Sequence, residues 1–278
     1  RTLGSLLAIY LLAALGVGWS WSQEPELFPV QQHAQASAEQ AQRKLVAGYT
    51  TVETLKQVAG TLLNKPGGYL SNDIAPPGLW LDNMPAWEYG VLVQVRDLSR
   101  ALRKDFARSQ SQSTEDPDLA KAEPRFNFDN KSWALPASEA EYAEGIKSLD
   151  RYLVRLADPS QPNAQFYARA DNLNNWLGDT ATRLGSLSQR LSASVGRVRL
   201  NTDMSDKTPA EGEAVPLSEE EVKTPWLQID NVFYEARGQA WALSHILRAI
   251  EVDFADVLAK KNATVSVRQI IRELEAAQ

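Results

Sequence analysis

The side chains best suited to chemistry gather in residues 67–90, a stretch rich in glycine, proline and aromatic residues. Aromatic faces beside carboxylates and amides bind sugar rings, because C–H edges stack on the ring while hydroxyl groups form hydrogen bonds with the polar groups. A pair of carboxylates could also cleave a glycosidic bond. The candidate ligand-binding residues are Tyr69, Asn72, Asp73, Trp80, Asp82, Asn83, Trp87 and Glu88.

The same stretch also has a purely structural interpretation. Its Trp and Tyr side chains would fill the core of a helical domain while its polar groups cap neighbouring helix ends. Residues 125–135 (RFNFDNKSWAL) have a similar mixed character. In residues 163–179, Asn172, Asn175 and Asp179 share one face of a predicted helix. Because asparagine lowers helix propensity, this cluster indicates either a polar seam between helices or a ligand site.

No motif for a nucleophile, a metal or a cofactor is present in the sequence. There is no cysteine, and the two histidines, His33 and His245, lack metal-ligand spacing. Ser244 precedes His245, but adjacent helix positions do not face each other, and no G-x-S-x-G turn accompanies them. We therefore expect no cofactor, no metal site and no catalytic residue.

An uncharged apolar segment at residues 3–21 determines where the rest of the chain would lie. Its length of about 19 residues is close to the ~20 needed to cross a hydrocarbon layer. Trp19 and Trp21 stand at its end, where indole rings favour the headgroup region. Arg1 precedes it and the next basic residue is Arg43, so the positive-inside rule predicts a cytoplasmic N-terminus.

A cleaved signal peptide is the alternative, with Gly16 and Gly18 as a weak small-x-small cleavage pattern. The apolar run exceeds the usual length of about 7–15 residues, so we expect a retained anchor. Since the sequence opens with Arg1 rather than Met, we also expect further cytoplasmic residues before it. Small residues spaced four apart allow another membrane helix to approach closely, unless they are ordinary membrane-helix glycines. These membrane-packing candidates are Gly4, Ala8, Ala14 and Gly18.

Beyond this segment, apolar residues recur at helical spacing and no strand-like alternation persists. The predicted class is therefore all-α: one transmembrane helix, then a periplasmic helical bundle with long amphipathic helices and irregular loops. Capping boxes at Thr50-x-x-Glu53 and Ser138-x-x-Glu141 predict two helix starts. A helix of about 35 residues is expected to begin at Asn163. The predicted divisions are a transmembrane anchor (1–22), a juxtamembrane stalk (23–49), a helical domain (50–200) with the aromatic loop 64–84, an acidic linker (201–224) and C-terminal helices that pack on the same bundle (225–278).

Net charge restricts the partners. At −6 the chain offers no basic face for backbone phosphates, so nucleic acid is not an expected partner. The expected partners are other membrane proteins, bound through the transmembrane helix and the periplasmic helices, and membrane lipid.

Three long phrases carry a resemblance to a known family. They are LLNKPGGYLSNDIAPPGLWLDNMPAWEYG, QPNAQFYARADNLNNWLGDTATRLG and VFYEARGQAWALSHILRAIEVDFADVLAKKN. Together they resemble the bacterial inner-membrane family named domain of unknown function 2333 over nearly the whole chain. The resemblance implies a Gram-negative inner membrane and a periplasmic domain, and it brings no catalytic residues.

Three functions remain open from the sequence. The first is a non-enzymatic accessory or scaffold subunit of an envelope protein assembly, which the anchor and the missing catalytic motifs favour. The second is a periplasmic binder of peptidoglycan glycan or of a lipid headgroup, acting through the aromatic loop. The third is a carboxylate-based glycan hydrolase at the same place.

Overall fold

The computed structural model describes residues 2–108, 114–200 and 219–278. Helices form most of it, so the predicted helical class is confirmed. The helices are α1 (Thr2–Trp21), α2 (Val30–Gln40), α3 (Tyr49–Asn64), α4 (Asn83–Ala101), α5 (Leu119–Phe126), α6 (Ser138–Ala157), α7 (Ala170–Ser194), α8 (Ile229–Asp253), α9 (Ala255–Lys260) and α10 (Thr264–Ala276). Short 3-10 turns form η1 (Gly78–Trp80) and η4 (Trp226–Gln228), and a π-helical turn, η2 (Leu102–Phe106), extends α4.

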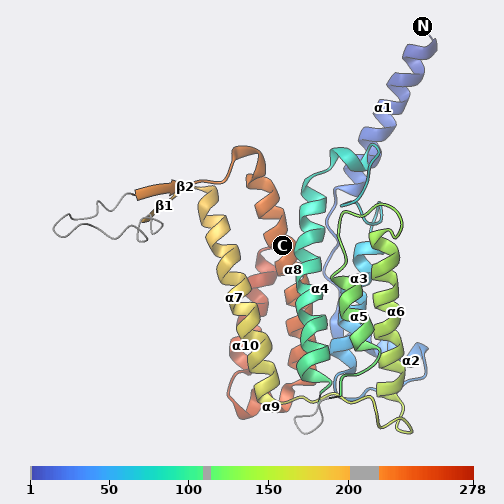
Figure 1. Cartoon of the computed structure of the whole chain (residues 1–278), viewed down its shortest axis with the longest axis vertical. Coiled ribbons are helices and arrows are strands. Elements are labelled where there is room, and N and C mark those ends of the chain that lie inside the picture. The colour runs from blue at the N-terminus through green and yellow to red at the C-terminus, as the bar shows by residue number, and fades with distance from the viewer. Residues whose placement is uncertain (1, 109–113, 201–218) are drawn as a thin grey trace, which may run out of the picture.

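Helix α1 projects away from the other helices (Figure 1). Its large apolar side chains are exposed, Leu6, Leu12 and Leu15 among them. Over Gly4–Trp21 it is long and apolar enough to cross a membrane, a property that an anchor and a signal sequence share. The described structure therefore contains an N-terminal apolar helix that the bundle itself does not bury.

Residues 23–49, predicted as a stalk, lie against the bundle. Glu24 forms an ion pair with Arg237 of α8 at 2.8 Å. The Phe28 N–H donates a hydrogen bond to Nε2 of His245 at 3.0 Å. Helix α2 then buries Val30, Ala34 and Ala38. The segment that follows α1 therefore contacts the helical bundle within a few residues of the end of α1.

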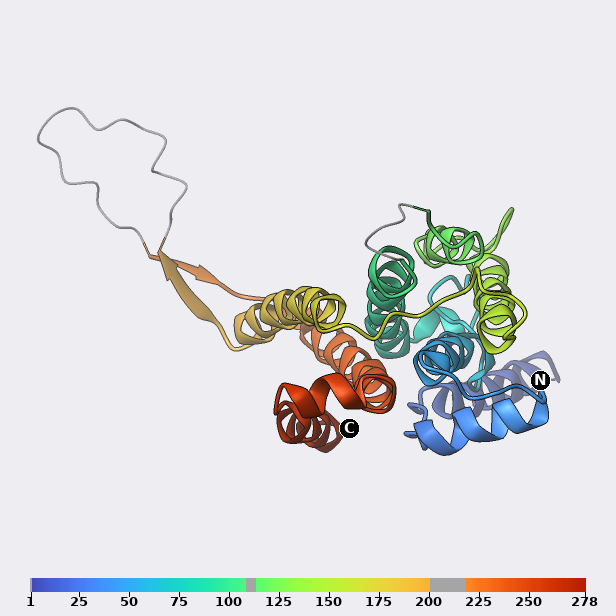
Figure 2. The same ribbon diagram turned by 90° about the horizontal axis from the view of Figure 1, so that it is seen from below.

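Helices α4 and α8 form the centre of the bundle, and two glycines let their backbones touch. A Cβ on Gly90 would lie 2.1 Å from the carbonyl oxygen of Glu235, and one on Gly238 would lie 2.1 Å from that of Trp87. The indole rings of Trp87 and Trp241 pack at 5.2 Å beside this crossing. Helices α3, α5 and α6 lie on one side of the pair, and α7 and α10 lie on the other (Figure 2).

Two predicted helices begin within one residue of Thr50 and at Ser138, but their predicted capping boxes do not form, and a third predicted start is wrong. Helix α3 begins after Gly48 and α6 after Ala137, without side-chain caps at either position. Ser138 instead donates to the carbonyl of Asp129 at 2.7 Å, which fixes the preceding loop. Helix α7 begins at Ala170 rather than at Asn163.

The stretch before α7 stays extended because tertiary contacts hold it. The Tyr167 N–H donates to the Phe106 carbonyl at 2.6 Å. The Phe166 ring packs on the rings of Phe106 and Phe254, at 5.5 and 5.6 Å. These contacts outweigh the local helical preference of the segment.

A short β-hairpin forms where the sequence predicts the last residues of the long helix and the last residues of the acidic linker. Strands β1 (Arg197–Leu200) and β2 (Glu219–Val222) pair antiparallel, with Arg197 opposite Val222. They project away from the helices (Figures 1 and 2). Most of the predicted acidic linker, residues 201–218, lies outside the described residues. Helices α8 and α10 pack on the same bundle as the earlier helices.

Candidate functional site

A buried ion pair holds the start of the aromatic loop 64–84. The ammonium of Lys65 lies 2.7 Å from Oε1 of Glu88, and both side chains are almost fully buried. Glu88 also accepts hydrogen bonds from the N–H groups of Leu70 and Ser71 at 2.9 and 2.8 Å, and from the Ser71 hydroxyl at 2.6 Å. Burial raises the pKa of Glu88, while the Lys65 charge and these donors act in the opposite direction. Both carboxylate oxygens are occupied, so Glu88 shapes the loop.

Two further predicted site residues connect this loop to the segment before α6. The Asn72 amide donates to the Ser132 carbonyl at 2.8 Å and to the Glu139 carboxylate at 2.7 Å. The Tyr69 hydroxyl donates to the Asn130 carbonyl at 3.1 Å. Tyr69 and Asn72 are both buried. Residues 127–137 are therefore fastened to the aromatic loop, and the mixed composition of both stretches serves this contact.

The remaining predicted site residues do not converge. Trp87 is fully buried in the core against Trp241, whereas Trp80 is half exposed. Asp82 is exposed and Asn83 is half-buried. Asp73 folds over Gly78, and burial together with the nearby Glu139 raises its pKa. The eight residues thus divide between core, loop support and surface, with no common ligand pocket.

Loop 64–84 lies beside the end of α1. A Cβ on Gly67 would lie 2.7 Å from the Trp21 indole, and one on Gly18 would lie 3.4 Å from Pro77. Gly18, predicted to pack against another membrane helix, therefore faces this chain's own loop. Gly67 and Pro77 were not predicted site residues. The Gly67-Gly68 and Pro76-Pro77 pairs were the available signal, because such pairs mark tight turns that approach neighbours closely.

The other membrane-packing candidates differ among themselves. Gly4 and Ala8 are exposed, and a Cβ on Gly4 would meet nothing within 4 Å. Ala14 is buried. The half of α1 that lies farther from the domain therefore keeps its small-residue face open.

A cavity of about 480 Å³ opens beside the aromatic loop. Residues from three loop regions line it, including Ser71 and Asp82 from the first, Lys131 from the second and Gln228 from the third. Arg190 of α7 closes one wall through an ion pair with Glu235 of α8. The lining mixes polar with apolar side chains, Pro85 and Val232 among the latter, and carries both signs of charge.

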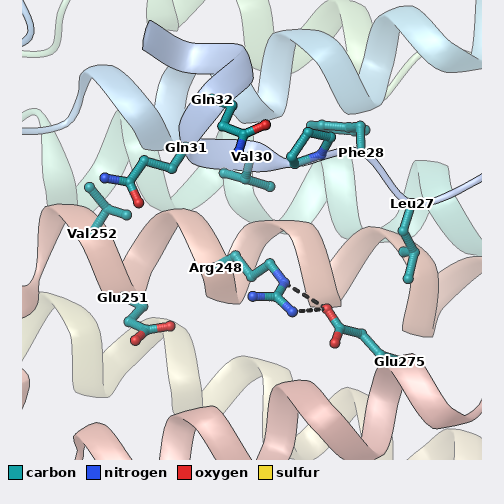
Figure 3. Close-up of a pocket in the computed structure, with 10 residues that line it drawn as sticks. Leu27, Phe28, Val30, Gln31, Gln32, Arg248, Glu251, Val252 and Glu275 are labelled. Atoms are coloured by element: carbon teal, nitrogen blue, oxygen red, sulfur yellow. Dashed lines mark hydrogen bonds and ion pairs between the residues drawn. The ribbon is translucent and has the colours of Figure 1, made fainter.

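A second cavity, of about 680 Å³, lies between the start of α2 and helices α8 and α10 (Figure 3). Leu27, Phe28 and Val30 form its apolar side, opposite the ion pair of Arg248 with Glu275 (Figure 3).

Behind Phe28, His245 and Ser244 have structural roles. His245 stacks on the Phe28 ring at 4.0 Å and its Nδ1 lies 2.6 Å from the Trp241 carbonyl. Because Nε2 accepts the Phe28 N–H, the Nδ1 atom carries the proton and the ring is neutral. Burial lowers the pKa of His245 to about 4. Ser244 donates to the same carbonyl at 2.8 Å, so its hydroxyl proton goes to the backbone and not to the histidine.

Three polar residues are predicted to share one face of α7. One of them is buried between helices, and the other two are exposed to solvent. Asn172 is buried and donates to the carbonyls of Asp105 and Tyr167 at 2.9 and 3.0 Å. Asn175 and Asp179 are exposed. Across the described ranges, no group of three or more potential metal ligands is present.

Comparison with known proteins places the chain in a family. No curated protein and no solved structure matches it. One family, described as uncharacterized protein conserved in bacteria, matches residues 1–278. The chain belongs to this bacterial family, domain of unknown function 2333.

Proposed function

We propose that this protein is a non-enzymatic accessory or scaffold subunit of a bacterial envelope assembly. In this proposal α1 is retained in the inner membrane, the N-terminus lies in the cytoplasm and the helical bundle lies in the periplasm. The partner is another membrane protein that contacts α1 and the bundle.

The exposure of α1 carries the proposal. An apolar helix of 20 residues that leaves its own domain needs lipid or another apolar helix around it. Its C-terminal part meets the domain, through Gly18 and Trp21. The open face with Gly4 and Ala8 suits close approach by a second helix.

Flanking charges support the orientation. Arg1 precedes the helix, and Glu24 and Glu26 follow it. Positive charges near a membrane helix favour the cytoplasmic side. The interior contacts of Glu88, Asn72 and Tyr69 support a non-enzymatic role, because these side chains maintain the loop.

Site-specific photo-cross-linking in intact cells tests the scaffold proposal. A cross-linking residue at Ala8 would lie on the small-residue face, while the matched position Ala13 lies about 140° around the helix. We expect one cross-linked product of discrete mass from Ala8 and none from Ala13. Equal cross-linking at both positions, or recovery of an uncross-linked monomer from both, would contradict the proposal.

A second candidate function is binding of a lipid headgroup in the cavity of about 480 Å³. Asp82 and Lys131 line it, so it offers charges for both the ammonium and the phosphate of a zwitterionic headgroup. The nearby Leu79 and Trp80 are exposed, and an apolar rim suits lipid better than glycan.

Titration of the full chain with a short-chain phosphatidylethanolamine tests this second candidate. We expect Lys131→Gln to weaken saturable binding several-fold. Lys121→Gln, at an exposed position of α5, should leave it unchanged. Identical binding curves for both variants would exclude the cavity as the headgroup site.

A further inference from the structure

We propose that the end of the bundle nearest α1 docks on the bilayer surface through three loop tips, each carrying a tryptophan and a leucine. This inference rests on the proposed membrane anchoring by α1. The tips are Leu79–Trp80 in η1, Trp133 with Leu135 before α6, and Trp226–Leu227 in η4.

All six side chains are open to solvent in the described structure. Their exposure ranges from 50% for Trp80 to 99% for Leu135. Large apolar side chains in this number on loop tips are costly in water, because the fold leaves half or more of each of them uncovered. Their exposure indicates an apolar environment that the chain itself does not supply.

The three tips lie at one end of the molecule, the end where α1 joins (Figure 1). The first tip belongs to the loop that contacts Trp21 through Gly67. The second belongs to the segment that Asn72 binds through the Ser132 carbonyl. The third precedes α8, whose first turns line one cavity together with the other two loops.

The tryptophans of this chain lie either in the core of the bundle or at the end nearest α1. The sequence has eight tryptophans. Three of them, Trp87, Trp176 and Trp241, are buried in the bundle. The other five lie in the last turn of α1 or on the three tips: Trp19, Trp21, Trp80, Trp133 and Trp226. At the far end of the bundle the exposed large apolar side chains include Leu45, Val154, Val252 and Val265, and no described tryptophan is exposed there.

A bilayer fits this arrangement better than a protein groove does. Indole rings favour the headgroup boundary, where the ring is in an apolar layer and its N–H can still donate a hydrogen bond. Trp19 and Trp21 already mark this boundary at the end of the proposed membrane helix. Because α1 is fixed to the first tip, it holds the other two tips near the same surface.

Spin labels can measure the depth of each tip directly, since the chain has no cysteine of its own. The full chain would be placed in phosphatidylethanolamine–phosphatidylglycerol vesicles, with a nitroxide on one introduced cysteine at a time. The tip variants are Leu79→Cys, Leu135→Cys and Leu227→Cys. Leu45→Cys and Val265→Cys serve as far-end controls, and Leu12→Cys reports on the anchor. All six positions are exposed, so the labels should not disturb the core.

Collision of the nitroxide with oxygen and with a water-soluble nickel complex gives the depth. We expect the three tip labels to lie at or below the lipid phosphates, the far-end labels to remain in water and the Leu12→Cys label to lie deep in the hydrocarbon. A deep Leu12→Cys label with all tip labels in water would overturn the docking inference and leave the anchor intact. A Leu12→Cys label in water would overturn the anchor itself.

Discussion

At the scale of single residues, the ion pair between Lys65 and Glu88 determines the shape of the aromatic loop. The pair is buried beneath the loop, and Glu88 organises the N–H groups of Leu70 and Ser71 around it. A carboxylate that four donors contact holds those donors firmly in position, because each donor would otherwise have to form a hydrogen bond with water. Glu88, a candidate ligand-binding residue from the sequence, therefore supports the loop.

Removal of one partner of this pair should be costly. In Lys65→Met the Glu88 carboxylate would stay buried without its counter-ion, and we expect a loss of about 3–5 kcal/mol in the free energy of unfolding. Urea unfolding of the full chain in detergent measures it. Lys147→Met, which breaks the exposed pair with Glu144, should give no measurable change. Equal effects of the two variants would contradict the structural role of Lys65.

His245 should make stability depend on pH. Its pKa of about 4 in the folded chain lies below the ordinary 6.5, so between these values the unfolded chain binds a proton that the folded chain does not. The contribution of this group is therefore complete above pH 6.5 and declines toward pH 4, by roughly 3 kcal/mol at ~1.4 kcal/mol per pH unit.

The variant His245→Gln isolates this effect. Glutamine can still accept the Phe28 N–H through its carbonyl oxygen, but it does not titrate. We expect a smaller loss of stability between pH 6.5 and 4 in the variant than in the native chain, by urea unfolding at several pH values. If the free energy of unfolding changed with pH equally in the variant and in the native chain, the histidine would not titrate as its burial requires.

At the scale of elements, the close crossing of α4 and α8 organises the bundle. Gly90 and Gly238 each face a carbonyl oxygen of the opposite helix at a distance that no side chain can occupy. The crossing brings Trp87 and Trp241 together and sets the positions of the loops before both helices. Loop geometry at the α1 end therefore depends on this contact.

The variant Gly90→Ala should separate the two helices. The added Cβ would meet the Glu235 carbonyl, and overpacking of this kind costs about 1–3 kcal/mol. Gly185→Ala is the matched control on α7, where a Cβ meets nothing within 4 Å. Alanine there should raise helix stability by about 0.5–1 kcal/mol. Thermal unfolding that shifts both variants in the same direction would argue against the close crossing.

Helical periodicity was sufficient to predict the long core helices. The stripes Val52, Leu55, Val58 and Leu62 of α3, and Trp87, Val91, Val95 and Leu98 of α4, are buried. Periodicity does not predict α5, because the start of this helix is held by remote charges. Arg155 of α6 binds Asp116 at 2.7 Å and Asp118 at 2.9 Å, and these aspartates precede α5.

The candidate site could be predicted only in part from the sequence. Composition identified the loop, and it identified Trp80 as a residue of interest. It could not separate Trp80 from Trp87, because exposure depends on which residues the fold places over each ring. Nor could it relate Trp80 to Trp133 and Trp226, because three segments distant in the sequence meet only in the folded bundle.

At the scale of the whole molecule, the domain has two unlike ends. One end carries α1, the three tryptophan tips and the cavity of about 480 Å³, and the other carries no exposed tryptophan among the described residues. This difference between the two ends suits a domain that contacts a membrane with one end and presents its remaining surface to partners. The extended segment through Glu24 and Phe28 fastens the domain to its proposed anchor along α8.

Labelling with a membrane-impermeant maleimide in cells with a permeabilised outer membrane tests the proposed anchoring and orientation most directly. Single-cysteine variants of the full chain, Thr2→Cys before most of the anchor and Val265→Cys at the far end of the bundle, give opposite predictions. We expect Val265→Cys to react in these cells and to remain in the membrane fraction, and Thr2→Cys to react only after lysis. Reaction of Val265→Cys only after lysis, or its release from the membrane as a cleaved product, would contradict the account.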